Sequence, residues 1–117
     1  MVVLPGGMPG AGNLAADKRL LRFLRGVWEM DGFVAAICAA PIVLKAAGLL
    51  KGRRMTAYPS FRDEFGESEY TEAAVERDGT LITGSGPGTA QRFAVALVEA
   101  LGLGQEAREL RKCMLML

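Results

Sequence analysis

A cysteine stands between two predicted elements in the run Ala35-Ala36-Ile37-Cys38-Ala39-Ala40-Pro41. The apolar residues before Cys38 predict a buried strand, and Pro41 fits the first turn of a helix, where a missing N–H costs nothing. A strand followed at once by a nucleophile and a helix is typical of a nucleophile elbow. The helix N-terminus favours thiolate over thiol, and the small Ala39 and Ala40 leave room for a substrate. The predicted chemistry is nucleophilic attack by the sulfur of Cys38.

Inert packing is the alternative role for Cys38, because cysteine is among the most buried residue types. The same role is predicted for Cys113, which begins an apolar tail and has no elbow around it. The chain has no histidine, the usual base near neutral pH and the commonest metal ligand. A zinc site and a histidine-containing triad are therefore not expected. The cysteine chemistry predicted here needs no cofactor.

The elements that must position Cys38 alternate between strands and helices. Strands are expected at 1–4, 33–37 and 55–58, and in a hairpin of 73–76 and 80–83 around Asp78-Gly79. Helices are expected at 14–28 with Asn13 as N-cap, from Pro41 to Gly48, from the turn at 84–89 to Leu101, and at 105–112. The polar stretch 59–70 is predicted to be a surface excursion. This alternation indicates α/β layering in one domain.

Composition excludes several classes of protein. The net charge is +1, from 14 basic and 13 acidic residues, so no global field favours nucleic acid or an anionic membrane. The basic series from Lys18 to Arg25 could be a nucleic-acid stripe, but its helical spacing favours the solvated side of an amphipathic helix. No apolar run has the length of a membrane span. Two cysteines make no disulfide framework, so the cytoplasm is the expected compartment.

The glycine-rich segment Gly84-Ser85-Gly86-Pro87-Gly88-Thr89 has two interpretations. It lies between a predicted strand and a predicted helix, as a phosphate cradle would. It matches neither the dinucleotide fingerprint nor the Walker pattern, because it lacks the spacing of the first and the lysine of the second. A tight strand-to-helix turn is the favoured interpretation.

Three motifs stand in the order and approximate spacing found in the ThiJ/PfpI superfamily: Val2-Val3-Leu4-Pro5-Gly6-Gly7, the run 35–41 around Cys38, and Gly86-Pro87-Gly88-Thr89. The segments 48–52 and 94–101 are similar to the same family, so the resemblance covers essentially all 117 residues. It implies a flavodoxin-like, three-layer α/β/α sandwich with a mostly parallel sheet. It also implies a homodimer and a relationship to class I glutamine amidotransferases.

The resemblance implies specific roles for four residues. Cys38 would be the nucleophile that attacks the carbonyl of glyoxal, methylglyoxal or their adducts. The backbone N–H groups of Gly7 and Ala39 would form the oxyanion hole. Tyr58 stands where many relatives carry histidine and could donate a hydrogen bond, although a phenol is a poor base at neutral pH. A core-edge aromatic is the alternative role for Tyr58.

The resemblance also implies that the family's domain starts upstream of Met1. The residues without a counterpart would form a central strand, a helix, a hairpin and the glutamate that hydrogen-bonds the reactive thiol. We therefore expect residues 1–117 to be a partial domain, either a truncated fragment or the product of a late start site.

Three functional hypotheses follow. The first is a cysteine-dependent deglycase or glyoxalase acting on a small carbonyl compound, a glycated protein or a glycated nucleotide. The second is a non-catalytic redox sensor or chaperone that works through oxidation of Cys38. The third is an inactive remnant, since loss of a central strand exposes the sheet edges of its neighbours.

Overall fold

A four-stranded sheet forms the centre of the computed structural model, which describes residues 1–116. Its strand order is β1-β2-β6-β5, where β1 is Val2–Leu4, β2 is Val34–Ile37, β5 is Val75–Asp78 and β6 is Leu81–Gly84. β1, β2 and β6 run parallel, and β5 pairs antiparallel with β6. The predicted hairpin is confirmed, since Gly79 with φ +62° lies at the turn between β5 and β6.

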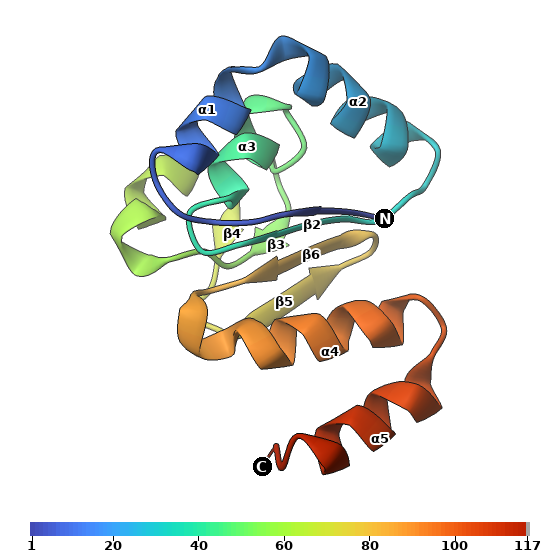
Figure 1. The fold of residues 1–117 in the computed structure, drawn as a ribbon. Coiled ribbons are helices and arrows are strands. Elements are labelled where there is room, and N and C mark those ends of the chain that lie inside the picture. The colour runs from blue at the N-terminus through green and yellow to red at the C-terminus, as the bar shows by residue number, and fades with distance from the viewer. Residues whose placement is uncertain (117) are drawn as a thin grey trace.

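Helices cover both faces of this sheet and give three layers (Figure 1). On one face lie α1 (Gly10–Ala16), α2 (Lys18–Glu29) and α3 (Pro41–Ala46). On the other lies α4 (Ala90–Ala100), with α5 (Gly104–Cys113) packed outside it. Leu24, Val43 and Leu81 are among the fully buried residues of the first core, and Ile82 packs with Phe93 in the second. The mostly parallel, flavodoxin-like α/β fold that the sequence predicts is confirmed.

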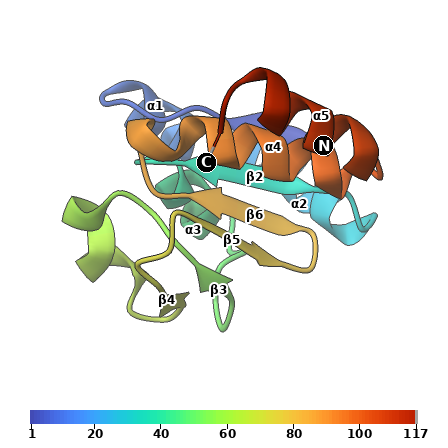
Figure 2. The same ribbon diagram turned by 90° about the horizontal axis from the view of Figure 1, so that it is seen from below.

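A second, two-stranded sheet lies beside β5 (Figure 2). It consists of β3 (Arg54–Met55) and β4 (Glu69–Tyr70), which run parallel. The guanidinium of Arg54 donates to the Glu76 carboxylate at 2.8 Å, and its backbone N–H donates to Asp78 at 3.0 Å. The hydrogen bond and charge of Glu76 raise the pKa of Arg54 above its ordinary value. These contacts fix the small sheet to the edge of the large one.

The predicted single helix over 14–28 is wrong, because the chain forms two helices that meet at Asp17. The Asp17 carboxylate accepts hydrogen bonds from the N–H groups of Arg19 at 2.9 Å and Leu20 at 3.2 Å. An aspartate that caps a new helix in this way interrupts the apolar spacing that suggested one continuous helix. Asn13 is therefore not the N-cap and lies inside α1.

The stretch 59–70, predicted to be a surface excursion, is more ordered than its composition suggests. It contains a 3₁₀ helix, η1 (Pro59–Phe65), and the strand β4. The Phe65 side chain is 2% exposed and stacks on Tyr70 with ring centroids 6.5 Å apart. Burial of the Phe65 ring, with Tyr70 partly buried against it, folds the segment back onto the domain. The strand predicted at 55–58 is correspondingly shorter and ends at Met55.

The cap at Asp17 predicts a pH-dependent stability. Its hydrogen bond from the N–H of Leu20 is the largest cause that lowers the Asp17 pKa below the ordinary 3.8. A carboxyl group with a lowered folded-state pKa stabilises the fold above about 3.8, and this contribution is lost as the pH falls through the folded pKa. We expect Asp17→Ala to lower the melting temperature at pH 7, with the difference shrinking in acid.

The control for this prediction is Asp17→Asn, which keeps the acceptor oxygen but has no charge to titrate. Thermal unfolding followed by circular dichroism between pH 7 and pH 3 measures all three proteins. A gap between wild type and Asp17→Ala that stays constant over this range would contradict the role assigned to the charge.

Candidate active site

Cys38 occupies a sharp turn between β2 and α3. Its backbone has φ +64°, in the left-handed region that residues with a side chain rarely adopt. Its N–H donates to the carbonyl of Gly84 at 2.9 Å, and its own carbonyl accepts from the N–H of Tyr58 at 2.9 Å. The side chain is half-buried. A strained turn held by the backbone between a strand and a helix is the geometry of a nucleophile elbow.

The loop after β1 lies directly against this elbow. A Cβ atom placed on Gly6 would be 2.8 Å from the Cβ of Cys38 and 2.9 Å from the carbonyl oxygen of Ile37. Only glycine allows so close an approach. The same position is 3.3 Å from the backbone nitrogen of Ala39, so the Gly6–Gly7 segment and Ala39 flank Cys38 together.

Two backbone donors beside Cys38 are unused within the described residues. The N–H groups of Gly7 and Ala39 have no hydrogen-bond acceptor anywhere in residues 1–116. Ala39 follows Cys38 in the sequence, and Gly7 follows Gly6, which packs against the turn at Cys38. Free N–H groups close to a nucleophile are the feature that an oxyanion hole requires. The oxyanion-hole roles of Gly7 and Ala39 stay predictions.

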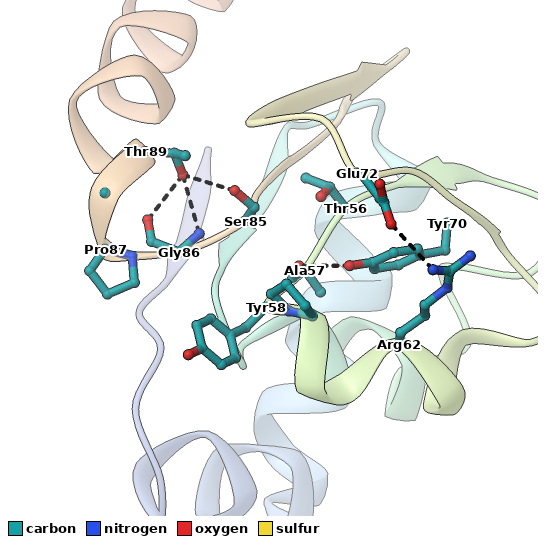
Figure 3. A pocket seen from close by; sticks show the side chains of 12 residues that line it. Thr56, Ala57, Tyr58, Arg62, Tyr70, Glu72, Ser85, Gly86, Pro87 and Thr89 are labelled. Atoms are coloured by element: carbon teal, nitrogen blue, oxygen red, sulfur yellow. Dashed lines mark hydrogen bonds and ion pairs between the residues drawn. The ribbon is translucent and has the colours of Figure 1, made fainter.

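Tyr58 reaches the elbow with its backbone, through the hydrogen bond to the Cys38 carbonyl. Its side chain is 44% exposed, and its ring is in contact distance of Gly86, where an added Cβ would lie 3.4 Å from Cδ2. Figure 3 shows the ring pointing away from Tyr70, on the side of Gly86 and Pro87. Its hydrogen-bonding role stays a prediction.

A cavity of about 520 Å³ lies next to the elbow. One wall comes from Thr56 to Pro59, and another from the turn Ser85 to Thr89. Arg62, Tyr70 and Glu72 complete the lining (Figure 3). The sequence prediction missed this part of the site, because it assigned Arg62 and Tyr70 to a polar surface segment and gave Glu72 no role. The available signal was the close spacing of Arg62, Tyr70 and Glu72 in a segment that also contains apolar aromatic residues.

The glycine-rich turn at 84–89 is held closed by its own threonine. Thr89 Oγ1 accepts from the N–H of Gly86 at 3.2 Å and donates to the Gly86 carbonyl at 3.0 Å. The Ser85 hydroxyl donates to Thr89 Oγ1 at 3.3 Å. Because the N–H of Gly86 is used within the turn, the geometry favours the strand-to-helix turn over a phosphate cradle.

Cys113 differs from the prediction, which placed it in an apolar tail as a packing residue. It is the last residue of α5, and its side chain is exposed. The tail residue Leu117 lies outside the described residues.

In residues 1–116 there is no group of three or more His, Cys, Asp or Glu side chains placed to hold a metal ion. Within the same range, no helix has both the length and the apolar character needed to cross a bilayer.

Buried threonines support one wall of the cavity and give a testable prediction. The N–H of Thr56 donates to Oγ1 of Thr83 at 2.9 Å, and both residues are fully buried. Thr83→Val keeps the shape of the side chain but removes this acceptor. We expect the free energy of unfolding to fall by about 1–2 kcal/mol, the cost of a buried unpaired donor. Urea denaturation measures this free energy. The control is Thr80→Val, whose hydroxyl has no partner among residues 1–116, and its free energy of unfolding should change little.

Taken together, the sheet, the elbow and the adjoining turn define a flavodoxin-like α/β protein with a cysteine at the carboxyl end of a central strand. The sequence profile of the DJ-1/PfpI family matches residues 1–100. The chain belongs to this family.

Individual relatives agree with this assignment. Protein dj-1beta of Drosophila melanogaster is 38% identical over 98% of the chain, and its crystal structure superposes with a TM-score of 0.94 at 37% identity over 99% of the chain. The glutathione-independent glyoxalase DJR-1.2 of Caenorhabditis elegans is 33% identical over 96% of the chain. Isonitrile hydratase of Pseudomonas putida is 35% identical over 86%. The chain spans 63%, 60% and 45% of these three proteins, respectively.

Proposed function

We propose that the chain carries the nucleophile of a glyoxalase or deglycase-type hydrolase that acts on methylglyoxal, glyoxal and their adducts. The observation that supports it most is the backbone of Cys38, held at φ +64° with the free N–H groups of Gly7 and Ala39 beside it. The similarity to a glyoxalase favours carbonyl chemistry, whereas the similarity to isonitrile hydratase shows that the family also contains other reactions.

The first proposed step is attack of the Cys38 thiolate on the aldehyde carbon of methylglyoxal. A C–S bond forms, and the electron pair of the C=O π bond moves to the oxygen. The resulting oxyanion accepts hydrogen bonds from the N–H groups of Gly7 and Ala39. Protonation of the oxyanion gives a hemithioacetal.

In the second step, the proton on the first carbon moves to the second carbon, and the hydroxyl proton of the hemithioacetal moves to the oxygen of the second carbon. This oxidises the first carbon and reduces the second, and it leaves a lactoyl thioester on Cys38. Water then breaks the C–S bond, releases lactate and restores the thiol. The sum is methylglyoxal plus water giving lactate, which balances without an external oxidant, metal or cofactor. An aminocarbinol or hemithioacetal adduct enters the same sequence once its amine or thiol has left.

The proton transfer in the second step requires a base. The resemblance implies a glutamate that hydrogen-bonds the reactive thiol, but it has no matching position in these 117 residues, and we assign the base to none of them. Tyr58 is the side chain that we propose as a hydrogen-bond donor to the substrate. From the resemblance we also propose a partial family domain over residues 1–117 and a homodimer, and from the cysteine content a cytoplasmic location.

The test is conversion of methylglyoxal to lactate by the purified chain, followed by proton NMR. Lactate formation that saturates with substrate concentration supports the proposal. A rate equal to that of a heat-denatured sample of the same chain contradicts it for these 117 residues.

A further inference from the structure

The cavity beside the elbow is too large for a three-carbon dicarbonyl alone. Its volume of about 520 Å³ lies within the range of about 300–1,000 Å³ found for pockets that hold drug-sized ligands. Each of two cavity walls is next to a hydrogen bond of the Cys38 backbone. Tyr58, in the first wall, donates its N–H to the Cys38 carbonyl. Ser85, in the second wall, follows Gly84, whose carbonyl accepts from the Cys38 N–H. Cys38 itself does not line the cavity. The cavity is therefore placed to hold the part of a substrate that does not react.

Two tyrosines and two prolines supply apolar surface around this space: Tyr58, Pro59, Tyr70 and Pro87. Tyr70 is fixed, since its hydroxyl donates to the Ala57 carbonyl at 3.2 Å and its ring stacks on the buried Phe65. Fixed apolar walls of this kind suit a short aliphatic chain, such as the stem of an amino-acid side chain.

A positive and a negative group stand side by side at one end of the cavity (Figure 3). Arg62 donates through one terminal nitrogen to one oxygen of the Glu72 carboxylate, at 3.3 Å. The Arg62 guanidinium also lies over the Tyr70 ring, 5.3 Å from its centroid. The second terminal nitrogen and Nε of Arg62, and the second oxygen of Glu72, have no partner among residues 1–116. Both side chains are well exposed to solvent, with 61% and 82% of their surface accessible.

This pair selects a ligand that carries both charges. A purely anionic group beside Arg62 would be repelled by Glu72, and a purely cationic group beside Glu72 would be repelled by Arg62. An α-amino acid head satisfies both, because its carboxylate fits the open fork of the guanidinium and its ammonium fits the free carboxylate oxygen. In a peptide chain these two groups are amides and carry no charge.

We propose that the cavity binds the zwitterionic head of a free amino acid whose side chain carries the carbonyl adduct. This inference rests on the proposed function and narrows its substrate to adducts of free amino acids. Arg62 and Glu72 are the specificity-determining residues, and the tyrosine and proline walls hold the stem that leads toward Cys38.

The experiment measures binding alone, so it does not depend on turnover. The probe is S-(2-hydroxypropyl)-L-cysteine, a stable thioether with the shape of a methylglyoxal–cysteine adduct, titrated into the chain by isothermal calorimetry. We expect its N-acetyl and methyl ester derivatives to bind at least tenfold more weakly to the unaltered chain. Arg62→Gln and Glu72→Gln should each weaken binding of the parent probe to a similar degree, whereas Arg108→Gln on the exposed side of α5 should not.

Two results would overturn this inference. One is equal or tighter binding of a probe that carries both the N-acetyl and the methyl ester group, which would indicate that peptide-borne adducts are preferred. The other is a parent probe that fails to bind at ten millimolar. Cys38→Ser is expected to bind the probe as the unaltered chain does. Normal binding of the probe without lactate formation would therefore contradict the proposed function and leave the amino-acid site intact. Lactate formation without binding of the probe would contradict the amino-acid site alone.

Discussion

Replacement of Cys38 by serine is expected to reduce lactate formation from methylglyoxal at least a hundredfold. The backbone bonds from Tyr58 and to Gly84 hold residue 38 in place, so the serine oxygen should occupy nearly the position of the sulfur. A serine hydroxyl without an adjacent base is almost entirely protonated at neutral pH, and it is a far weaker nucleophile than a thiolate. Initial rates at saturating substrate, measured by NMR on freshly reduced protein, give the comparison.

Cys113→Ser is the matched control, because it makes the same chemical change at the exposed end of α5. Its rate should stay within twofold of the unaltered chain. A Cys38→Ser protein that keeps its rate would show that another residue carries the reaction. If the unaltered chain has no turnover but peroxide oxidises Cys38 selectively, the redox-sensor hypothesis gains support. Absence of a cooperative unfolding transition would favour the inactive remnant.

The second large effect is expected at Gly6, where the loop after β1 meets the elbow. In Gly6→Ala the new methyl group would lie 2.8 Å from the Cβ of Cys38 and 2.9 Å from the Ile37 carbonyl oxygen. Both obstacles belong to the rigid turn and cannot rotate away, so the two segments must separate. We expect the free energy of unfolding to fall by about 2–3 kcal/mol, in the upper range for overpacking. Urea denaturation measures the change.

Gly10→Ala is the control for this substitution. A Cβ on Gly10 meets no atom within 4 Å, and Gly10 lies at the start of α1, where alanine is well tolerated. Its stability should be equal to or slightly above that of the unaltered chain. Gly6→Ala should also lower the rate of lactate formation about tenfold in the folded protein, because Gly7 moves away from Ala39. Equal stability of the two variants would show that the loop is not pressed against the elbow.

The elbow itself was predictable from local sequence. An unbroken apolar run from residue 33 to 37, a cysteine, and Pro41 in the first turn of α3 are short-range signals, and the structure confirms the strand and the helix that they predict. The close approach of Gly6 was not predictable from local pattern alone. It depends on β1 pairing in parallel with β2, in the register that sets Leu4 beside Ala36.

Other features depend on contacts that local pattern does not contain. The break at Asp17 was missed because the apolar spacing on both sides of it fits one helix, and only the capping bonds reveal two. The cavity was missed for a different reason. Arg62 and Glu72 come into contact only because Phe65 is buried and turns the segment back, and burial of one aromatic residue in a polar stretch is a tertiary effect.

The positive φ at Cys38 has a consequence for how this sequence can change over generations. A residue with a side chain in the left-handed region costs about 1–2 kcal/mol, and glycine adopts it freely. The change Cys38→Gly should therefore make the fold more stable while it removes the sulfur. Selection for stability and selection for activity act in opposite directions at this one position. Under the proposed function, position 38 is therefore a place where activity is kept at a cost in stability.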